Sequence, residues 1–493
     1  METIYSIKPF LAILVSFFMV PVIISSRNEN VREGWTFVAA VVKFVLIVSM
    51  VPIVLKGVQL KYTIVEVLPS LAIELRVDTF GLLFALVSSF LWIITSAYSI
   101  GYMRGLHEHS QTRYFSFFAL SLSATVGVAF SANLLTMYLF YEMLSLSTYP
   151  LVTHHQDKEA KISGRKYLTF LLGSSIGFLL PAMLYTYYLT GSLEFSPQGL
   201  FAGHGSQTTI LVLLLLYIFG FAKAGVMPLH AWLPAAMVAP TPVSALLHAV
   251  AVVKVGVFCV VRTITFVFGV EFLTSLNVST ILCTLASITI IVSSLIALTQ
   301  DGLKRLLAFS TIGQLSYIIF GAALLSPTAL VGSMLHIAMH AFGKITLFFC
   351  AGAIFVATGV RNISQMVGIG KRMPITMLAF FIGSLSVIGI PPCGGFISKW
   401  FLVIGALESK QIFFMIIILV SSLLNAAYFL PIVYRAFFCT EKESLFESKV
   451  QEAPMWCVVP LSLTALVSIG LFFYPQPFLK LAQLTVQALT GGS

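Results

Sequence analysis

The hydrophobic residues of this 493-residue chain are grouped in long continuous runs that short polar connections separate. An apolar run of about 20 residues is long enough to cross a bilayer as a helix. The runs do not alternate apolar and polar positions, which favours helices over the strands of a barrel. We therefore expect an all-α integral membrane protein with about fourteen transmembrane helices. The runs lie near residues 5–26, 35–55, 79–101, 114–131, 133–152, 166–190, 209–226, 241–265, 274–298, 306–325, 329–356, 374–407, 411–438 and 455–478.

Composition supports the same class of protein. The sequence is 58% hydrophobic and only 9% charged, with a mean hydropathy of +0.99. Soluble proteins carry roughly 25% charged residues, so this chain is not expected to cover a water-facing surface. The first run lacks an Ala-x-Ala-like cleavage site and is expected to remain as a span. The connections are too short for a catalytic domain, so any chemistry is expected within the membrane or on another chain.

The lysines and arginines of the connections mark the orientation of the chain. Most of them follow odd-numbered runs, and few lie at the termini or after even-numbered runs. Because cytoplasmic connections carry the excess of positive charge, both termini are expected on the outer, periplasmic side of the cell membrane. The net charge of +10 is explained by this bias, and no nucleic-acid partner is expected.

Two runs carry glycine and proline in their middle, between residues 220 and 234 and between residues 389 and 400. Proline removes a backbone donor and clashes with the preceding turn, so both helices are expected to be discontinuous. The breaks lie five runs apart, so the second unit would cross the membrane in the opposite sense, as in inverted-repeat transporters. We predict helices 1–3 in residues 1–110, a five-helix repeat in 111–268, its inverted counterpart in 269–440, and helix 14 in 441–493.

Glu142 is the only acid that lies deep within an apolar run. Charges in a bilayer core are costly and usually face protein or water, which makes each one a functional hypothesis. If Glu142 and Lys223 approach and separate, the proton affinity of the lysine changes, and the pair can gate proton transfer. The alternative is a static ion pair that joins two helices, although buried pairs are weak sources of stability. The other lysines in apolar surroundings are Lys254, Lys344 and Lys399.

Lys254 and Lys399 extend the predicted proton path. Lys254 follows the broken seventh run and is interpreted as a proton stepping stone. His248, six residues earlier, is either part of the relay or a hydrogen-bonded packing residue. Lys399 is the counterpart of Lys223 in the second repeat and is predicted to be the terminal proton site. Alternatively, Trp400 marks the membrane interface and Lys399 extends its ammonium group to the headgroups.

His336, His340 and Lys344 recur every four residues, which places them on one face of a helix. Histidine titrates near neutral pH, so this stripe is predicted to carry protons. A metal-binding histidine pair and a polar seam between helices are the alternatives. No Glu follows the first histidine, no third ligand is evident, and the six cysteines form no C-x-x-C pair. We therefore expect no metal and no cofactor.

Other ionisable residues have structural interpretations. Lys43 lies in the middle of a run without an evident partner, and a packing or subunit-contact role competes with a functional one. Asp78 is expected to cap the helix that follows it. Asp301, Lys304 and Arg305 are expected to form a cytoplasmic turn.

Six stretches of the sequence together carry a resemblance to a known family. They are Tyr141–Pro150, Lys223–Pro234, Pro240–Lys254, Leu303–Ser316, His336–Lys344 and Gly389–Trp400. In combination they resemble the antiporter-like subunits, a family that comprises the D and A subunits of Mrp-type cation/proton antiporters, the proton-pumping membrane subunits of respiratory complex I, and their counterparts in membrane-bound hydrogenases. The resemblance implies a fourteen-helix fold with a central polar axis, in which Glu142, Lys223, Lys254 and Lys399 carry protons. The lysine at position 399 and an end after fourteen spans favour the Mrp D type.

Three hypotheses follow. The first is an Mrp D-like subunit that exchanges protons for Na⁺ or another monovalent cation, with other membrane subunits and the lipid bilayer as partners. The second is a proton-pumping subunit of a redox complex related to NADH dehydrogenase or a membrane-bound hydrogenase. The third is a membrane scaffold for another transport system, which would have no need of so many buried ionisable groups. No catalytic chemistry is expected on the chain itself, and the sequence does not separate the first two hypotheses because their driving forces lie on partners.

Overall fold

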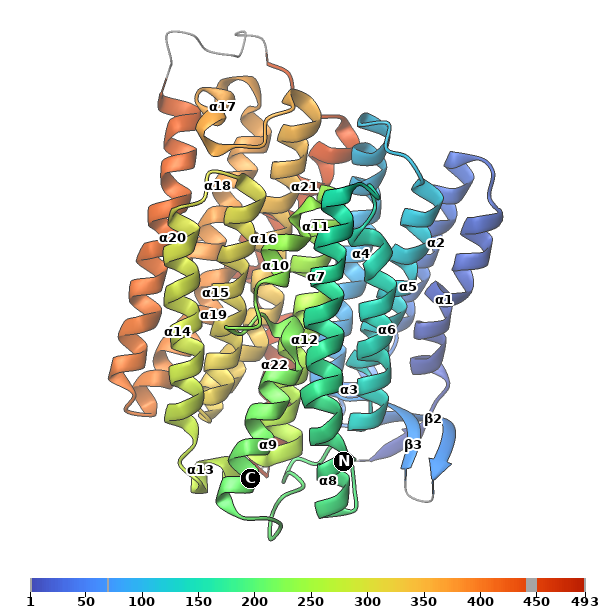
Figure 1. Cartoon of the computed structure of the whole chain (residues 1–493), viewed down its shortest axis with the longest axis vertical. Coiled ribbons are helices and arrows are strands. Elements are labelled where there is room, and N and C mark those ends of the chain that lie inside the picture. The colour runs from blue at the N-terminus through green and yellow to red at the C-terminus, as the bar shows by residue number, and fades with distance from the viewer. Residues whose placement is uncertain (1, 69–70, 440–449, 492–493) are drawn as a thin grey trace.

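Long helices lying side by side make up most of the computed structural model, which describes residues 2–68, 71–439 and 450–491 (Figure 1). Ten of the described helices are long and apolar enough to cross a membrane. Each of the fourteen predicted runs falls on helical segments. The helical membrane fold is therefore confirmed, while the number of crossings and the division into inverted repeats stay predictions.

A small sheet precedes the third predicted span. The strands β1 (Thr3–Tyr5), β2 (Gln59–Leu68) and β3 (Leu71–Val77) lie in the order β1-β2-β3. β1 pairs with β2 in parallel, and β2 pairs with β3 in an antiparallel fashion. The β-branched residues Thr63, Ile64 and Val65 are the strand signal here, which a search for long apolar runs passes over.

Four helices belong to the N-terminal region that contains these strands. They are α1 (Lys8–Ser25), α2 (Glu29–Val48), α3 (Val51–Val54) and α4 (Thr79–Gly105). Asp78 caps α4 as predicted, because its carboxylate accepts the N–H of Gly81 at 2.7 Å.

The first predicted repeat contains several changes of helical winding. Three π-helical segments and two 3₁₀ segments interrupt its α-helices. In order, the elements are α5 (Gln111–Ala129), α6 (Leu134–Val152), α7 (Lys158–Ser174), η1 (Ser175–Leu179), α8 (Leu180–Thr190), α9 (Gln207–Gly220), η2 (Ala222–Ala224), α10 (Trp232–Ala235), η3 (Ala236–Val238), α11 (Thr241–Ala245), η4 (Leu246–Val250), α12 (Val252–Arg262) and η5 (Thr263–Gly269).

The second predicted repeat is built around α16, the longest described helix. Its elements are α13 (Val270–Ser275), α14 (Ser279–Leu298), α15 (Leu303–Ala323), α16 (Pro327–Thr358), η6 (Ile363–Met366), α17 (Ile369–Arg372), α18 (Pro374–Ile388), α19 (Gly394–Glu408) and α20 (Ile412–Phe438). All residues from Ala329 to Ile354 of α16 are buried, and so is every residue of α12. These two helices therefore hold the interior of the molecule.

Both predicted discontinuities are confirmed. α9 ends at Gly220 and is followed by the short η2, whose C-cap Gly225 has a φ of 71°. α18 ends at Ile388, and α19 begins only at Gly394. Glycine adopts such positive φ values without the steric cost that other residues meet.

The C-terminal region contains two helices, α21 (Met455–Phe473) and α22 (Gln476–Leu489), where a single one was expected. Pro475 and Pro477 lie at the start of α22, where proline is compatible with a new helix but not with a continued one. The two ends of the chain lie at the same end of the molecule (Figure 1), as expected for an even number of crossings.

Candidate functional site

The short η2 segment presents Lys223 to α6. The ammonium group of Lys223 donates to the carbonyl of Tyr141 at 2.8 Å and to Ser145 Oγ at 2.6 Å. It also lies 3.1 Å from the centroid of the Tyr141 ring, in cation–π contact. Lys223 is fully buried, so the break in the helix brings its charge into the interior and against the turn that contains Glu142.

Glu142 lies one residue beyond Tyr141 on α6, and both of its carboxylate oxygens are buried. Within the described ranges, neither oxygen has a hydrogen-bond partner, and no ion pair joins Glu142 to Lys223. The static ion pair considered above is therefore not formed in this structure. A buried carboxylate without a partner is unfavourable, so Glu142 lacks the contacts that would stabilise it in this arrangement.

Lys254 meets the histidine stripe at the centre of the molecule. Its Nζ lies 2.6 Å from His340 Nδ1, which joins α12 to α16. The rings of His340 and His336 are stacked, with centroids 5.7 Å apart and an angle of 21° between their planes. Lys254, His340 and His336 therefore form one buried line of titratable groups.

His336 continues this line towards α19 and α15. Its Nδ1 lies 2.8 Å from Ser398 Oγ, and its Nε2 lies 3.2 Å from Gln314 Oε1. Ser398 directly precedes Lys399 on α19. We call Lys254, His340, His336 and Ser398 the polar line. It ends next to Lys399, the last predicted relay residue.

Lys399 is held by the end of the broken helix α18. Its ammonium group donates to the carbonyls of Val387 and Ile388, both at 2.9 Å, and to Ser422 Oγ at 3.2 Å. A helix C-terminus carries partial negative charge and attracts cations. Lys399 is only 5% exposed, whereas Trp400 is 52% exposed. The side chain is therefore directed into the protein, and the alternative in which it reaches the headgroups is not supported.

Lys344 and His248 lie beside this line. Lys344, one turn beyond His340, donates to Ser310 Oγ at 2.8 Å. His248 lies in η4, with its ring 5.0 Å from that of Phe348. In the part of the chain that the structure describes, neither ring nitrogen of His248 has a hydrogen-bond partner. Relay and packing therefore both stay predictions for His248.

A family of known membrane proteins matches more than half of this chain. Residues 131–425 match the family described as "NADH:quinone oxidoreductase/Mrp antiporter, TM". The chain belongs to this family. The resemblance seen in its motifs is thereby confirmed.

Proteins similar in sequence to this chain include subunits of NADH-quinone oxidoreductases and of Na⁺/H⁺ antiporters. The chain is 32% identical to NADH-quinone oxidoreductase subunit N of Desulforudis audaxviator over 79% of its length and 78% of that protein. It is 30% identical to the A-type subunit of the Na⁺/H⁺ antiporter of Alkalihalophilus pseudofirmus, over 95% of this chain but only 60% of that protein. Relatives of the N and A types do not single out the D type.

Two solved structures share the fold. A chain of the Mrp complex from Dietzia sp. has a TM-score of 0.86 and 22% identity, and the match covers 98% of this chain and 97% of that chain. A chain of the membrane-bound sulfane sulfur reductase, an archaeal respiratory membrane complex, has a TM-score of 0.87 and 24% identity, with 99% and 98% covered. Both come from membrane complexes, one an Mrp complex and the other respiratory.

Gly256 allows α12, the helix that carries Lys254, to come close to η2, the segment that carries Lys223. A Cβ atom at Gly256 would lie 2.2 Å from the backbone N of Ala224 and from the backbone C of Lys223. Because glycine has no Cβ, α12 packs directly against η2. The helix of Lys254 therefore touches the segment of Lys223, although no hydrogen bond joins the two side chains among the described contacts.

The neutral partners of the ionisable groups were not predicted as site residues. All of them lie within the stretches that carry the family resemblance, next to a titratable residue or one to two turns from it. The partners are Tyr141, Ser145, Ser310, Gln314 and Ser398.

The remaining predictions concern structural residues. Lys43 is buried and donates to the carbonyl of Leu122 at 2.9 Å, which ties α2 to α5 and agrees with a packing role. Asp301 accepts the N–H and the hydroxyl of Ser364, both at 2.9 Å, and Lys304 donates to the carbonyl of Ala239 at 2.5 Å. Asp301 precedes α15, whereas Lys304 and Arg305 lie in its first helical turn, so the predicted turn ends before Lys304 and its cytoplasmic side stays a prediction.

Proposed function

We propose that this chain is a proton-translocating subunit of a multi-subunit membrane complex. The observation that carries the proposal is the 2.6 Å contact between Lys254 Nζ and His340 Nδ1 within a fully buried line of titratable side chains. Two positive charges at this distance repel strongly, more so away from bulk water. Lys254 and His340 therefore share one proton, and a proton that arrives on one group displaces the proton of the other.

The transfer steps follow from the contacts. A proton passes from the Lys254 ammonium group to His340 Nδ1, so that one N–H bond breaks and another forms. The stacked ring of His336 and the hydroxyl of Ser398 lead from there towards Lys399. At the other end, Lys223 is held by Tyr141 and Ser145, and Glu142 offers a free carboxylate nearby. We propose that movement of Lys223 towards Glu142 favours its charged form, and that movement away from Glu142 releases the proton.

The host complex is proposed to be an Mrp-type antiporter in which protons exchange for Na⁺ or another monovalent cation, with this chain as the D-type subunit. Lys399, which resembles the lysine of that branch of the family, supports the assignment. The second candidate is a redox-driven pump related to NADH dehydrogenase, and the similarity to subunit N over 79% of the chain favours it. Purification of the intact complex from its source separates the two. Small antiporter subunits alone support the first candidate, and iron–sulfur subunits support the second.

The proton path is tested with a matched pair of lysines. Lys254 and Lys43 are both fully buried, but Lys254 contacts a titratable histidine, whereas Lys43 contacts a backbone carbonyl. Lys254→Met is expected to reduce proton movement to background in vesicles that contain the assembled complex. Lys43→Met is expected to retain proton movement per assembled complex while lowering its thermal stability.

The readout is a pH-sensitive dye inside the vesicles, normalised to the amount of assembled complex. Normal proton movement in Lys254→Met would remove this contact from the path. If both variants assemble normally but neither moves protons, the defect would come from the loss of any buried lysine and not from the loss of the contact between Lys254 and His340.

A further inference from the structure

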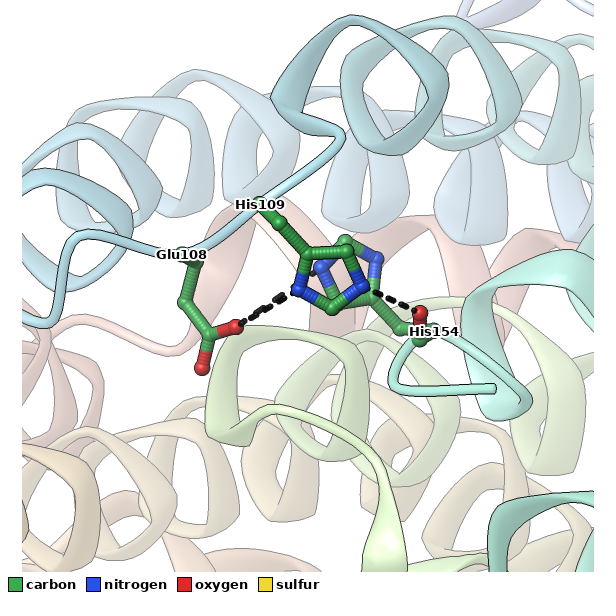
Figure 2. Close-up of side chains that lie close together, drawn as sticks. All are labelled: Glu108, His109 and His154. Carbon is green, nitrogen blue, oxygen red and sulfur yellow. Dashed lines mark hydrogen bonds and ion pairs between the residues drawn. The ribbon is translucent and has the colours of Figure 1, made fainter. Parts of the chain in front are cut away.

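A second group of ionisable side chains lies away from the polar line, where two connections meet at one end of the helices. Glu108 and His109 belong to the connection between α4 and α5, and His154 and His155 to the connection between α6 and α7. Figure 2 shows Glu108, His109 and His154 turned towards one another. We call these four residues the Glu108 cluster.

One carboxylate oxygen is the centre of this cluster. Glu108 Oε2 lies 3.9 Å from His109 Nδ1, 3.8 Å from His154 Nε2 and 3.7 Å from His155 Nδ1. These separations are too long for hydrogen bonds. They are close to the spacing of about 3.3 Å between ligand atoms that surround Zn²⁺ tetrahedrally at 2.0–2.1 Å. One ligand atom from each of Glu108, His109 and His154 lies within 4.8 Å of the other two.

His154 supplies an independent sign of a missing partner. Its side chain is fully buried, and neither ring nitrogen has a hydrogen-bond partner among the described residues. A buried imidazole without a hydrogen-bond partner is unfavourable, and a bound metal ion would supply the missing partner.

The backbone around the cluster fixes the orientation of His109. Its Nε2 donates to the carbonyl of His154 at 3.1 Å, because a carbonyl only accepts hydrogen bonds. With a proton on Nε2, the lone pair available to a metal ion is that of Nδ1, the nitrogen that faces Glu108. Metal-binding histidines typically use their second nitrogen in this way. Arg113 donates to the same carbonyl at 2.6 Å.

We propose that Glu108, His109 and His154 bind Zn²⁺ or a similar divalent transition-metal ion, with His155 beside them. Imidazole nitrogens with a carboxylate oxygen suit such ions better than Mg²⁺ or Ca²⁺, which prefer oxygen ligands. The ion would join the connection after α4 to the end of α6, the helix that carries Glu142. This proposal does not depend on the proposed proton function.

The test measures metal content of the full complex, purified with a tag that contains no histidine. The complex is stripped with a chelator, incubated with Zn²⁺ and dialysed, and its zinc is measured by mass spectrometry. About one zinc ion per copy of this chain is expected. Glu108→Gln and His109→Gln alter partly exposed side chains and are expected to lose the ion without loss of assembly.

His204→Ala is the control, because His204 is an exposed histidine on another connection and should leave zinc content unchanged. Co²⁺ serves as a spectroscopic probe, and its tetrahedral absorption bands should appear in the wild type and disappear in Glu108→Gln. Wild-type zinc content in both Glu108→Gln and His109→Gln would overturn the proposal, as would the absence of zinc from the wild type after incubation.

Discussion

The five buried lysines of the described residues differ in what their ammonium groups contact. Lys43 relies on a backbone carbonyl and Lys344 on a serine hydroxyl, whereas Lys223 and Lys399 each use groups of both kinds. Lys254 contacts the imidazole of His340. Carbonyls and hydroxyls stabilise a charged lysine but do not readily take its proton, whereas imidazole does both. Under the proposed function, the contact between Lys254 and His340 is therefore the one expected to pass a proton on most easily.

Glu142 gives a prediction that separates a relay from a structural role. Glu142→Gln keeps the size of the side chain and removes its charge and its ability to release a proton. Because Glu142 makes no ion pair within the described residues, we expect normal amounts of assembled complex. Proton movement in vesicles should fall by about 100-fold or more, the usual contribution of a positioned proton-transfer group. Poor assembly with unchanged activity per complex would instead support a structural pair.

The titratable members of the site could be predicted from the sequence, but their partners could not. Glu142 and the lysines stand out because charge is rare in apolar runs. Ser145, Ser310 and Ser398 do not stand out, because serine is common in membrane helices and usually bonds to its own helix. The contact of Lys254 with His340 joins residues 86 positions apart, and no local pattern indicates it. For His248, relay and packing both stay predictions, because its ring contacts Phe348 and neither ring nitrogen has a hydrogen-bond partner among the described residues.

The close packing of α12 against η2 requires glycine at position 256. Gly256→Ala would place a Cβ atom 2.2 Å from the backbone of η2, where no side chain can move aside. Overpacking in a tight interior typically costs about 1–3 kcal/mol. We expect the variant to lower the melting temperature of the complex and to impair proton movement, because Lys223 and Lys254 lie on the two elements that are pushed apart.

Gly173→Ala is the matched control for this variant. Gly173 lies within α7, and a Cβ atom added there would meet nothing within 4 Å. The substitution should leave the melting temperature unchanged or raise it slightly, since alanine favours helices. If Gly256→Ala behaves like Gly173→Ala in a melting experiment, α12 does not depend on close contact with η2.

The elements themselves were predictable to different degrees. The glycines and prolines of residues 220–234 and 389–400 indicated both helix breaks. The π-helical segments η4 and η5 on either side of α12 were not predicted, because a change of hydrogen-bond register leaves little trace in composition. The sheet was missed because β1 depends on pairing with residues more than fifty positions away.

At the scale of the whole molecule, a buried ion pair joins two segments that lie far apart in the sequence. Arg262, at the end of α12, binds the carboxylate of Asp78 through both guanidinium Nη atoms, while Asp78 also caps α4. Burial alone raises the pKa of Asp78, but the charge and hydrogen bonds of Arg262, the N–H of Gly81 and the charge of Arg76 together lower it. The pair therefore links two parts of the fold that are 184 residues apart.

Loss of this pair is predicted to destabilise the protein in a pH-dependent way. Asp78→Asn leaves the buried Arg262 uncompensated, at a cost of about 3–5 kcal/mol near neutral pH. Because folding lowers the pKa of Asp78, its contribution is fully present above the ordinary aspartate pKa and is lost as the pH falls from there through the lowered pKa of the folded protein. Melting temperatures of the wild type and of Asp78→Asn should therefore converge below about pH 4. Asp78→Asn combined with Arg262→Met should recover part of the loss, and a constant difference at all pH values would contradict this account.

The parallel pairing of β1 with β2 affects where a tag or fusion protein can be attached to the chain. Thr3–Tyr5 form an edge strand directly ahead of α1, and their partner residues Gln59–Lys61 are synthesised only after α1 and α2. A bulky fusion placed just before Thr3 would crowd this late-forming strand pair, whereas α22 near the other end contributes no strand. Affinity handles and fluorescent reporters should therefore perturb the protein least when they follow α22.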